Sequence, residues 1–253
     1  MDTRIDSLLK ADPFSPELMR DPQPFYRALR DHEPVKFYPE YDTFFLSRFE
    51  DVWQAPAYAS LEPLAPGPTL PSPFYEAMRQ AHIAPLRPRA VANIAEFIRK
   101  TVDDRLDYVL SLGSFDLIAD FAGHVNSAVV CLLFGIDTAR AGELFNIVAQ
   151  ITRVDPLQGG VDFNKFFERL TDQIIPAVQM RRTNGADGSN LLIDGLINYR
   201  MPDGRALDDK EISNQLTCVM IAGMESASKV TASGLVELFS RPDQLAEVRQ
   251  DLD

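Results

Sequence analysis

Apolar residues recur every three or four positions along most of the chain, which is the spacing of amphipathic helices. Residues 128–133 are apolar on every side, so the helix that holds them is expected to be central. The sequence therefore predicts a mainly α-helical fold. The predicted helices cover residues 15–31, 91–112, 117–134, 138–152, 163–182 and 189–199, besides a longer one discussed below.

A short segment near the N-terminus follows a different pattern. Two runs rich in aromatic and β-branched residues, 35–37 and 43–47, flank a turn-forming stretch at 39–42 and predict a β-hairpin. A short helix is expected to begin at residues 49–53. The stretch 56–73 then holds six prolines and one glycine, a composition that predicts a long loop.

The longest predicted helix covers residues 208–239 and has clear boundaries at both ends. Asp208 can accept a hydrogen bond from the amide three residues on, Glu211 can reach back, and Leu207 can pack on Ile212. Pro242 cannot continue the helix. About 30 residues at 1.5 Å each give about 45 Å, enough to cross a domain. The apolar run inside this helix is too short for a membrane span.

The middle of this helix carries an unusual group of small residues. Ala222, Gly223, Ser226 and Ala227 lie on one side, beside Glu225. A glycine inside a helix costs about 1 kcal/mol relative to alanine, so its presence needs a reason. One interpretation is close packing against another helix, with the serine hydroxyl bonded to its own turn. The other is a groove that admits something flat or bulky, with a carboxylate and a hydroxyl at its edge.

Composition and charge narrow the class of protein. The 253 residues carry a net charge of −12, which argues against a nucleic-acid backbone as the main partner. Cys131 and Cys218 form no Cys-x-x-Cys pair, so neither a zinc site nor disulfides are expected, and a cytoplasmic location fits. His32, His82 and His124 lie far apart, without metal-ligand spacing. The first residues contain no apolar segment, so neither a signal peptide nor a membrane anchor is expected.

The sequence Ala222-Gly223-Met224-Glu225-Ser226 resembles the distal-helix signature of the cytochromes P450, the haem-thiolate monooxygenases, which usually reads Ala/Gly-Gly-x-Asp/Glu-Thr-Thr. Leu86-Arg87-Pro88-Arg89-Ala90-Val91 is similar to the family's Phe-Thr-Pro-Arg-x-Val. The segments 190–192, 202–204 and 211–212 also look like the approach to the distal helix in bacterial members. The resemblance extends from Asp12 to the end of the chain. It implies the family's helical fold with a small β element.

The resemblance also implies a haem b lying beneath the distal helix. Glu225 and Ser226 would then be the catalytic residues that relay protons, and Ala222 and Gly223 would leave room for dioxygen beside the cofactor. Ser226 stands where the family usually has threonine; it keeps the hydroxyl and loses the methyl group that restricts the rotamer. The residues implied to face substrate are Cys218, Ile221 and Ala222.

A second contact with the cofactor is implied by residues 74–86, which resemble the helix with the family's His-x-x-x-Arg pattern. Arg79 matches the arginine that binds a haem propionate, and Tyr75 stands where the histidine normally lies. A tyrosine hydroxyl can donate to a carboxylate but adds no positive charge. Both residues are therefore predicted to bind the cofactor.

The sequence lacks the loop that supplies the iron ligand in this family. That cysteine lies in Phe-x-x-Gly-x-x-x-Cys-x-Gly, and neither Cys131 nor Cys218 has this setting. No metal ligand is therefore expected within these residues. We expect residues 1–253 to form a single incomplete domain, the N-terminal portion of the enzyme, with the thiolate ligand beyond residue 253.

The function implied by the resemblance is insertion of one oxygen atom from O2 into an apolar small molecule. Electrons would come from a protein of ferredoxin or flavodoxin type. Neither nucleic acid nor a membrane is expected as a partner. Two other classes stay open. A helical ligand-binding or regulatory protein without redox chemistry is one. A hydrolase using Ser226 with Glu225 is the other, and it is disfavoured because the sequence has no Gly-x-Ser-x-Gly motif and no histidine near them.

Overall fold

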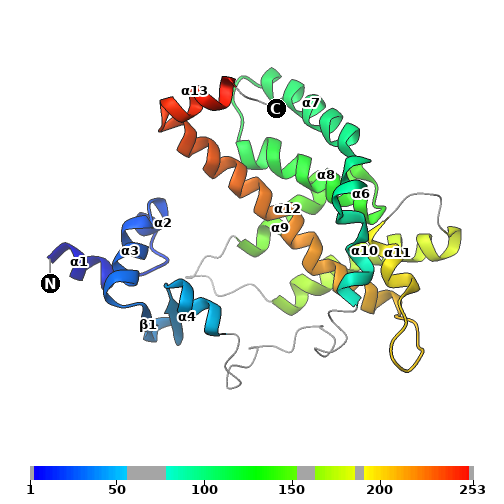
Figure 1. Cartoon of the computed structure of the whole chain (residues 1–253), viewed down its shortest axis with the longest axis horizontal. Helices are drawn as coiled ribbons and strands as arrows, with labels where there is room; N and C mark the ends of the chain where they lie inside the picture. The colour runs from blue at the N-terminus through cyan, green and yellow to red at the C-terminus, as the bar shows by residue number, and fades with distance from the viewer. Residues whose placement is uncertain (1–2, 56–77, 153–162, 186–190, 251–253) are drawn as a thin grey trace. The chain divides into compact units, whose positions relative to one another are not determined.

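The computed structural model describes residues 3–55, 78–152, 163–185 and 191–250 (Figure 1). These residues belong to two compact units, an N-terminal unit, Met1–Gly67, and a large unit, Pro68–Asp253. The predicted fold, mainly helical with a small β-hairpin, is confirmed over the described ranges. The single domain expected over residues 1–253 stays a prediction.

The N-terminal unit consists of short helices and an antiparallel hairpin. Strand β1 (Val35–Tyr38) pairs with β2 (Thr43–Leu46) through the 3₁₀ turn η1 (Pro39–Tyr41), as the sequence predicted. The helices are α1 (Thr3–Leu9), α2 (Pro16–Arg20), α3 (Gln23–His32) and α4 (Phe49–Gln54). Apolar side chains from the first three helices and from β1 form the core of this unit: Leu9, Leu18, Phe25, Ala28, Leu29 and Tyr38.

The amphipathic helix predicted over residues 15–31 is in fact two helices, α2 and α3. Asp21, at the end of α2, has φ −142° and ψ 81°, which lies outside the helical region, and Pro22 follows it. Proline has no amide hydrogen and disfavours a helical backbone at the preceding residue. The chain therefore breaks here although the apolar spacing continues, and the prediction of one helix was wrong.

The large unit is helical in its described parts, apart from an isolated bridge between Arg200 and Ala206. It begins with a helical turn at residues 78–82. The elements that follow are η3 (Ala84–Leu86), α6 (Pro88–Ala92), α7 (Ala95–Ser111), the π-helical η4 (Leu117–Ala122), α8 (Gly123–Phe134), η5 (Thr138–Arg140), α9 (Ala141–Thr152), α10 (Phe163–Asn184), α11 (Leu192–Asn198), α12 (Asp209–Phe239) and α13 (Pro242–Gln250).

Helix α12 organises the large unit. It packs against α8, α9, α10 and α11, and Figure 1 shows it crossing the unit and ending at α13. Ile212, Leu216, Met220 and Met224 recur every four residues on its inner side and are fully buried. Each such side chain stabilises the fold by roughly 1.5–3 kcal/mol. The prediction of one long helix that ends before Pro242 is confirmed.

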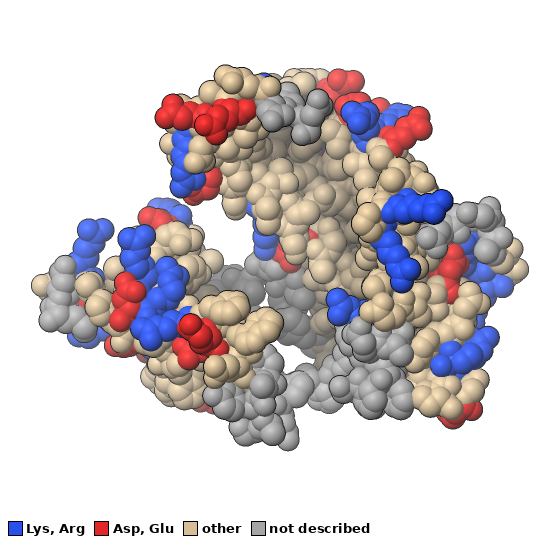
Figure 2. All heavy atoms as spheres, in the orientation of Figure 1, with Lys and Arg blue, Asp and Glu red and all other residues tan. Residues whose placement is uncertain are grey.

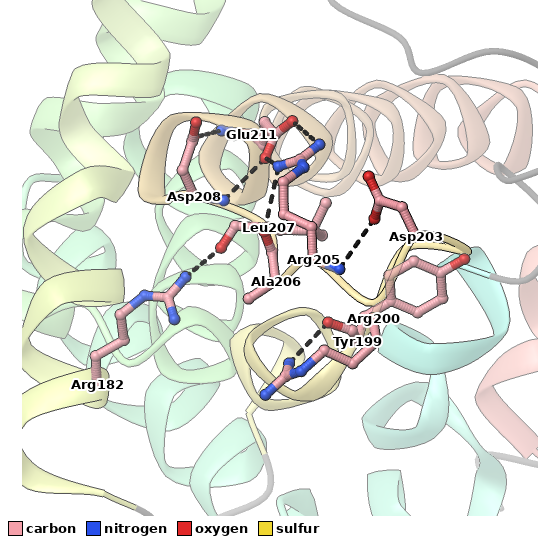
Figure 3. A network of polar contacts seen from close by, with 9 residues as sticks. All are labelled: Arg182, Tyr199, Arg200, Asp203, Arg205, Ala206, Leu207, Asp208 and Glu211. Atoms are coloured by element: carbon pink, nitrogen blue, oxygen red, sulfur yellow. Dashed lines mark hydrogen bonds and ion pairs between the residues drawn. The ribbon is translucent and has the colours of Figure 1, made fainter.

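The start of α12 is held by the network shown in Figure 3. The Glu211 amide donates to Asp208 Oδ1 (2.7 Å), and the Asp208 amide donates to Glu211 Oε2 (2.8 Å), which confirms the predicted capping box. The Arg205 guanidinium adds two bonds to the Glu211 carboxylate, at 2.7 and 2.9 Å. Arg182 donates to the carbonyl of Leu207 at 2.6 Å, which ties α10 to the same point. The first turn of α12 is thus fixed to its neighbours by several charged bonds.

A small group of polar side chains interrupts the apolar interface between α10 and α12. The Thr171 hydroxyl donates to Asn214 Oδ1 at 2.8 Å and lies 3.2 Å from the Thr217 hydroxyl. Both threonines are fully buried. Thr217 also donates to the carbonyl of Ser213, one turn earlier, at 2.9 Å. The Thr171 hydroxyl therefore finds its partners across the interface, whereas Thr217 also has one in its own helix.

Helix α8 lies in the core, as its apolar composition predicted. Asp116 caps the preceding π-helical turn by accepting from the amides of Ile118 and Ala119, both at 2.8 Å, and Gly135 ends α8 with φ 68°. Within the described residues, Leu117–Phe134 is the one stretch long and apolar enough to cross a membrane, and 44% of it is buried. Its contacts with α9 and α12 explain that composition as a core helix.

Two other helices differ from the prediction in their extent. The helix predicted over residues 91–112 is split into α6 and α7 around Asn93 and Ile94. The helix predicted over residues 74–86 is seen from Met78, and its last part is the 3₁₀ turn η3. The proline-rich loop predicted at 56–73 and the connection before α10 lie outside the described residues.

Candidate functional site

Three of the predicted site residues form a row along one side of α12. Cys218, Ala222 and Ser226 follow one another at four-residue steps, and all three are exposed. We call this row the α12 stripe. No side chain in it is larger than that of cysteine, while the opposite side of the helix is buried in the core. The helix therefore offers a shallow surface on which its own backbone can be approached closely.

Ile221 and Glu225 flank the stripe and are half-buried. Glu225 Oε1 lies 2.5 Å from Lys229 Nζ, and the glutamate side chain is only 16% exposed. The lysine stands four residues further along the same helix, the spacing at which glutamate and lysine form favourable pairs. This pair fixes the carboxylate at the edge of the stripe. Sequence reasoning missed Lys229, although the four-residue spacing was a sufficient signal.

The hydroxyls of Ser226 and Ser228 have different environments although they are two residues apart. Ser228 is fully buried, donates to the carbonyl of Met224 at 2.9 Å and accepts from Asn126 Nδ2 at 3.0 Å. Ser226 is exposed and, within the described part of the chain, its hydroxyl makes no hydrogen bond. The bond to its own turn that one interpretation assumed is therefore not formed. The hydroxyl is available to an external group.

Gly223 faces another helix. A Cβ atom built on Gly223 would lie 2.8 Å from Cγ2 of Val130 in α8, too close for an ordinary contact. Close helix packing is thus a sufficient reason for this glycine. The role beside the cofactor that the resemblance implied for Gly223 stays a prediction.

Arg79 is exposed on the helical turn at residues 78–82, away from α12 in sequence. The same turn contains His82, which is buried and whose Nδ1 lies 3.0 Å from the carbonyl oxygen of Met78. Burial lowers the pKa of His82, with a smaller effect from the nearby charge of Arg79. The second predicted cofactor residue on this segment, Tyr75, lies outside the described residues.

Neither cysteine has the environment of an activated thiol. Cys131 is fully buried in α8, and burial raises its pKa to about 11. Cys218 is exposed over part of its surface, yet burial of the remainder also raises its pKa. A raised pKa disfavours the thiolate. Cys131 therefore acts as a small apolar core residue, and Cys218 contributes a small, uncharged side chain to the stripe.

On the face shown in Figure 2, charged side chains of the large unit lie mostly along its outer edge. The hollowed surface beside α12 and α7 is mostly uncharged in this view. Acidic and basic side chains are mixed along that edge, with no extended patch of one sign. The surface near α12 is therefore better suited to an apolar group than to a polyanion.

Comparison with known proteins shows that the sequence is similar to cytochromes P450. The family model described as Cytochrome P450 matches residues 133–253. Cytochrome P450 130 of Mycobacterium tuberculosis (H37Rv) is 31% identical over 90% of this chain and 62% of its own length. Putative cytochrome P450 123 of the same strain is 27% identical over 97% of this chain. The 6-deoxyerythronolide B hydroxylase of Saccharopolyspora erythraea is 27% identical over 64% of this chain.

Solved structures share the fold. CalO2 matches with a TM-score of 0.73 at 22% identity, covering 97% of this chain and 66% of its own. P450BioI, solved in complex with an acyl carrier protein that bears hexadec-9Z-enoic acid, matches with a TM-score of 0.72 at 19% identity and covers 93% of this chain. The sequence spans about two thirds, 65%, of the length of the P450 123 relative.

Proposed function

The chain belongs to the cytochrome P450 family, and on that premise we propose that the whole protein is a haem-dependent monooxygenase. It inserts one oxygen atom from O2 into an apolar small molecule. The observation that carries the proposal is the α12 stripe, a row of small exposed side chains with a half-buried carboxylate at its edge. A relative named as a hydroxylase supports the same reaction type.

The residues present fit the family's cofactor, haem b. The stripe itself holds no side chain larger than cysteine, so a flat macrocycle can approach α12 along residues 218–226. When bound, the haem supplies the activation of dioxygen, chemistry that amino-acid side chains do not perform. Ala222, with only a methyl group, leaves space for O2 at this surface, and Gly223 is proposed to extend that space.

The positively charged side chain of Arg79 is proposed to bind a carboxylate of the haem. The residue is exposed on its turn, and a guanidinium forms strong, charge-assisted bonds with carboxylates. Tyr75 would donate its hydroxyl to the same group, four residues earlier on the predicted helix. The turn that carries Arg79 is anchored in the core by Met78, which is fully buried.

Glu225 and Ser226 are proposed to move protons toward the site. Lys229 holds the Glu225 carboxylate at the edge of the stripe. The adjacent Ser226 hydroxyl can accept one hydrogen bond and donate another, which is what a relay needs. A positioned acid–base group accelerates a reaction by roughly 10²–10⁴-fold. The missing methyl of threonine leaves this hydroxyl freer to rotate than in most of the family.

The substrate is proposed to lie against Cys218, Ile221 and Ala222. These side chains are small or apolar, and burial raises the pKa of the Cys218 thiol, which further disfavours its charged form. They therefore select an apolar molecule. The electron donor is proposed to be a ferredoxin or flavodoxin. The proposed location is cytoplasmic. The thiolate ligand is proposed to be a cysteine beyond residue 253.

Carbon monoxide difference spectroscopy tests the proposal. Thiolate ligation gives the reduced carbonyl complex of this family its red-shifted absorption. The full-length gene product should show that band, whereas residues 1–253 alone, supplied with haem, should not. A thiolate-type band from residues 1–253 would contradict a ligand beyond residue 253. Absence of haem binding by the full-length protein would overturn the proposed monooxygenase function and favour a non-catalytic ligand-binding protein.

A further inference from the structure

Gly195 in α11 lies directly against the backbone of the turn that carries Arg79. A Cβ atom built on Gly195 would lie 1.9 Å from the carbonyl oxygen of Ala81, 2.5 Å from its carbonyl carbon and 2.9 Å from Cα of His82. These are backbone atoms, which cannot rotate away as the end of a side chain can. Any residue other than glycine therefore forces α11 and the turn apart.

Helix α11 is the better-anchored partner in this contact. The Arg181 guanidinium of α10 donates two bonds to the Asp194 carboxylate, at 2.6 and 2.8 Å, and its side chain is only 7% exposed. The Leu191 amide donates to the same carboxylate at 3.0 Å. Three further side chains of α11 are buried in the main core: Leu192, Ile193 and Leu196. Strain at Gly195 will therefore move the turn more than α11.

The turn transmits such a movement to Arg79. The Ile83 amide donates to the carbonyl of Arg79 at 3.1 Å, so Arg79 belongs to the same hydrogen-bonded turn as Ala81 and His82. The contact between His82 Nδ1 and the Met78 carbonyl, at 3.0 Å, couples the other end of the turn. A displacement at Ala81 consequently shifts the base of the Arg79 side chain.

We infer that Gly195 is a positioning residue for Arg79, and through it for the carboxylate of the cofactor. The inference rests on the proposed function, in which Arg79 binds the haem. Changes in groups that orient a ligand typically weaken affinity by 10–100-fold, and the substitution Gly195→Ala is expected at the low end, a roughly 10-fold faster loss of haem. This effect should act through Arg79 alone.

The test is a double-mutant cycle on haem transfer from the full-length protein to a haem scavenger. Gly195→Ala, Arg79→Ala and the double variant are compared with the parent. Gly234→Ala is the matched control, since a Cβ atom on Gly234 in α12 would meet nothing within 4 Å. We expect Gly195→Ala to accelerate haem loss in the parent and to add less than about twofold to Arg79→Ala, with Gly234→Ala unchanged.

Two results would overturn the inference while leaving the proposed function intact. One is a parent rate of haem loss in a folded Gly195→Ala variant. The other is an effect of Gly195→Ala on the rate of haem loss that is as large in the Arg79→Ala background as in the parent. If Gly195→Ala does not fold, Arg181→Lys, which loosens the anchor of α11 without a clash, is taken through the same cycle, and full additivity there counts against the inference. A parent protein that binds no haem refutes both proposals.

Discussion

Ser226 and Ser228 allow the chemistry of α12 to be separated from its stability by two substitutions of the same kind. Ser228→Ala removes a fully buried hydroxyl that bonds to the Met224 carbonyl and leaves the Asn126 amide without its acceptor. Leaving one buried group unsatisfied costs about 1–3 kcal/mol. Ser226→Ala removes an exposed hydroxyl that makes no hydrogen bond within the described residues. Its effect on the free energy of unfolding should stay within about 0.5 kcal/mol.

When the reaction is measured, Ser226→Ala should be the impaired variant and Ser228→Ala should behave like the parent. If Ser226 relays protons, its alanine variant loses part of a roughly 10²–10⁴-fold contribution. Because the position is exposed, water can partly replace the hydroxyl, and we expect a loss near the lower limit. Product formed per reduced cofactor consumed should fall strongly in Ser226→Ala, while substrate affinity changes little. Ser228→Ala should keep parent coupling and unfold at lower urea concentration.

Both quantities are measured on the same preparations of full-length protein, with Ser233→Ala as the control for an exposed serine of α12. Unchanged coupling in Ser226→Ala would refute the relay. Equal destabilisation by Ser226→Ala and Ser228→Ala would refute the assignment of one exposed and one buried hydroxyl. Uncoupling in Ser233→Ala would show that the effect is not specific to the stripe.

Three further predictions concern other parts of the large unit. Arg79→Ala should accelerate haem loss, since a charge-assisted bond contributes about 1.5–3 kcal/mol; parent kinetics of transfer to a scavenger would contradict this. Bonding to Arg205 lowers the pKa of Glu211, so its stabilisation is present at neutral pH and is lost as pH falls below its ordinary value near 4.5. Urea unfolding should accordingly show a larger free energy of unfolding for the parent than for Glu211→Gln at pH 7, and equal values at acid pH. A difference that does not change with pH would contradict stabilisation by the Glu211 carboxylate. Gly223→Ala should destabilise by its clash with α8, whereas Gly234→Ala should stabilise by up to about 1 kcal/mol; equal unfolding midpoints for the two would contradict the packing.

The sequence was most informative where a few neighbouring residues determine the structure. Asp208 and Glu211 predicted the start of α12, because a capping box depends on side chains three positions apart. The end of α8 at Phe134 and the hairpin between 35 and 47 were also predicted from the sequence.

Contacts between distant segments could not be predicted in this way. Nothing in the sequence around Gly195 indicates that Ala81, more than a hundred positions earlier, lies against it. Close packing of Gly223 against another helix was one of two interpretations, but the sequence did not indicate that its neighbour is Val130 of α8. The break at Pro22 is different: its local signal was present, but the continuing apolar spacing outweighed it in the prediction of residues 15–31.

The polar group between α10 and α12 limits how these two helices can move. Thr171 is buried, and its hydroxyl meets Asn214 and Thr217 of α12 in the observed alignment. Sliding α10 by one turn, about 5.4 Å, would separate the Thr171 hydroxyl from Asn214 and Thr217. Leaving that buried hydroxyl unsatisfied would cost about 1–3 kcal/mol. Lengthwise sliding is therefore disfavoured, and an opening of α10 that keeps Thr171 in contact with α12 has to be a tilt about this point.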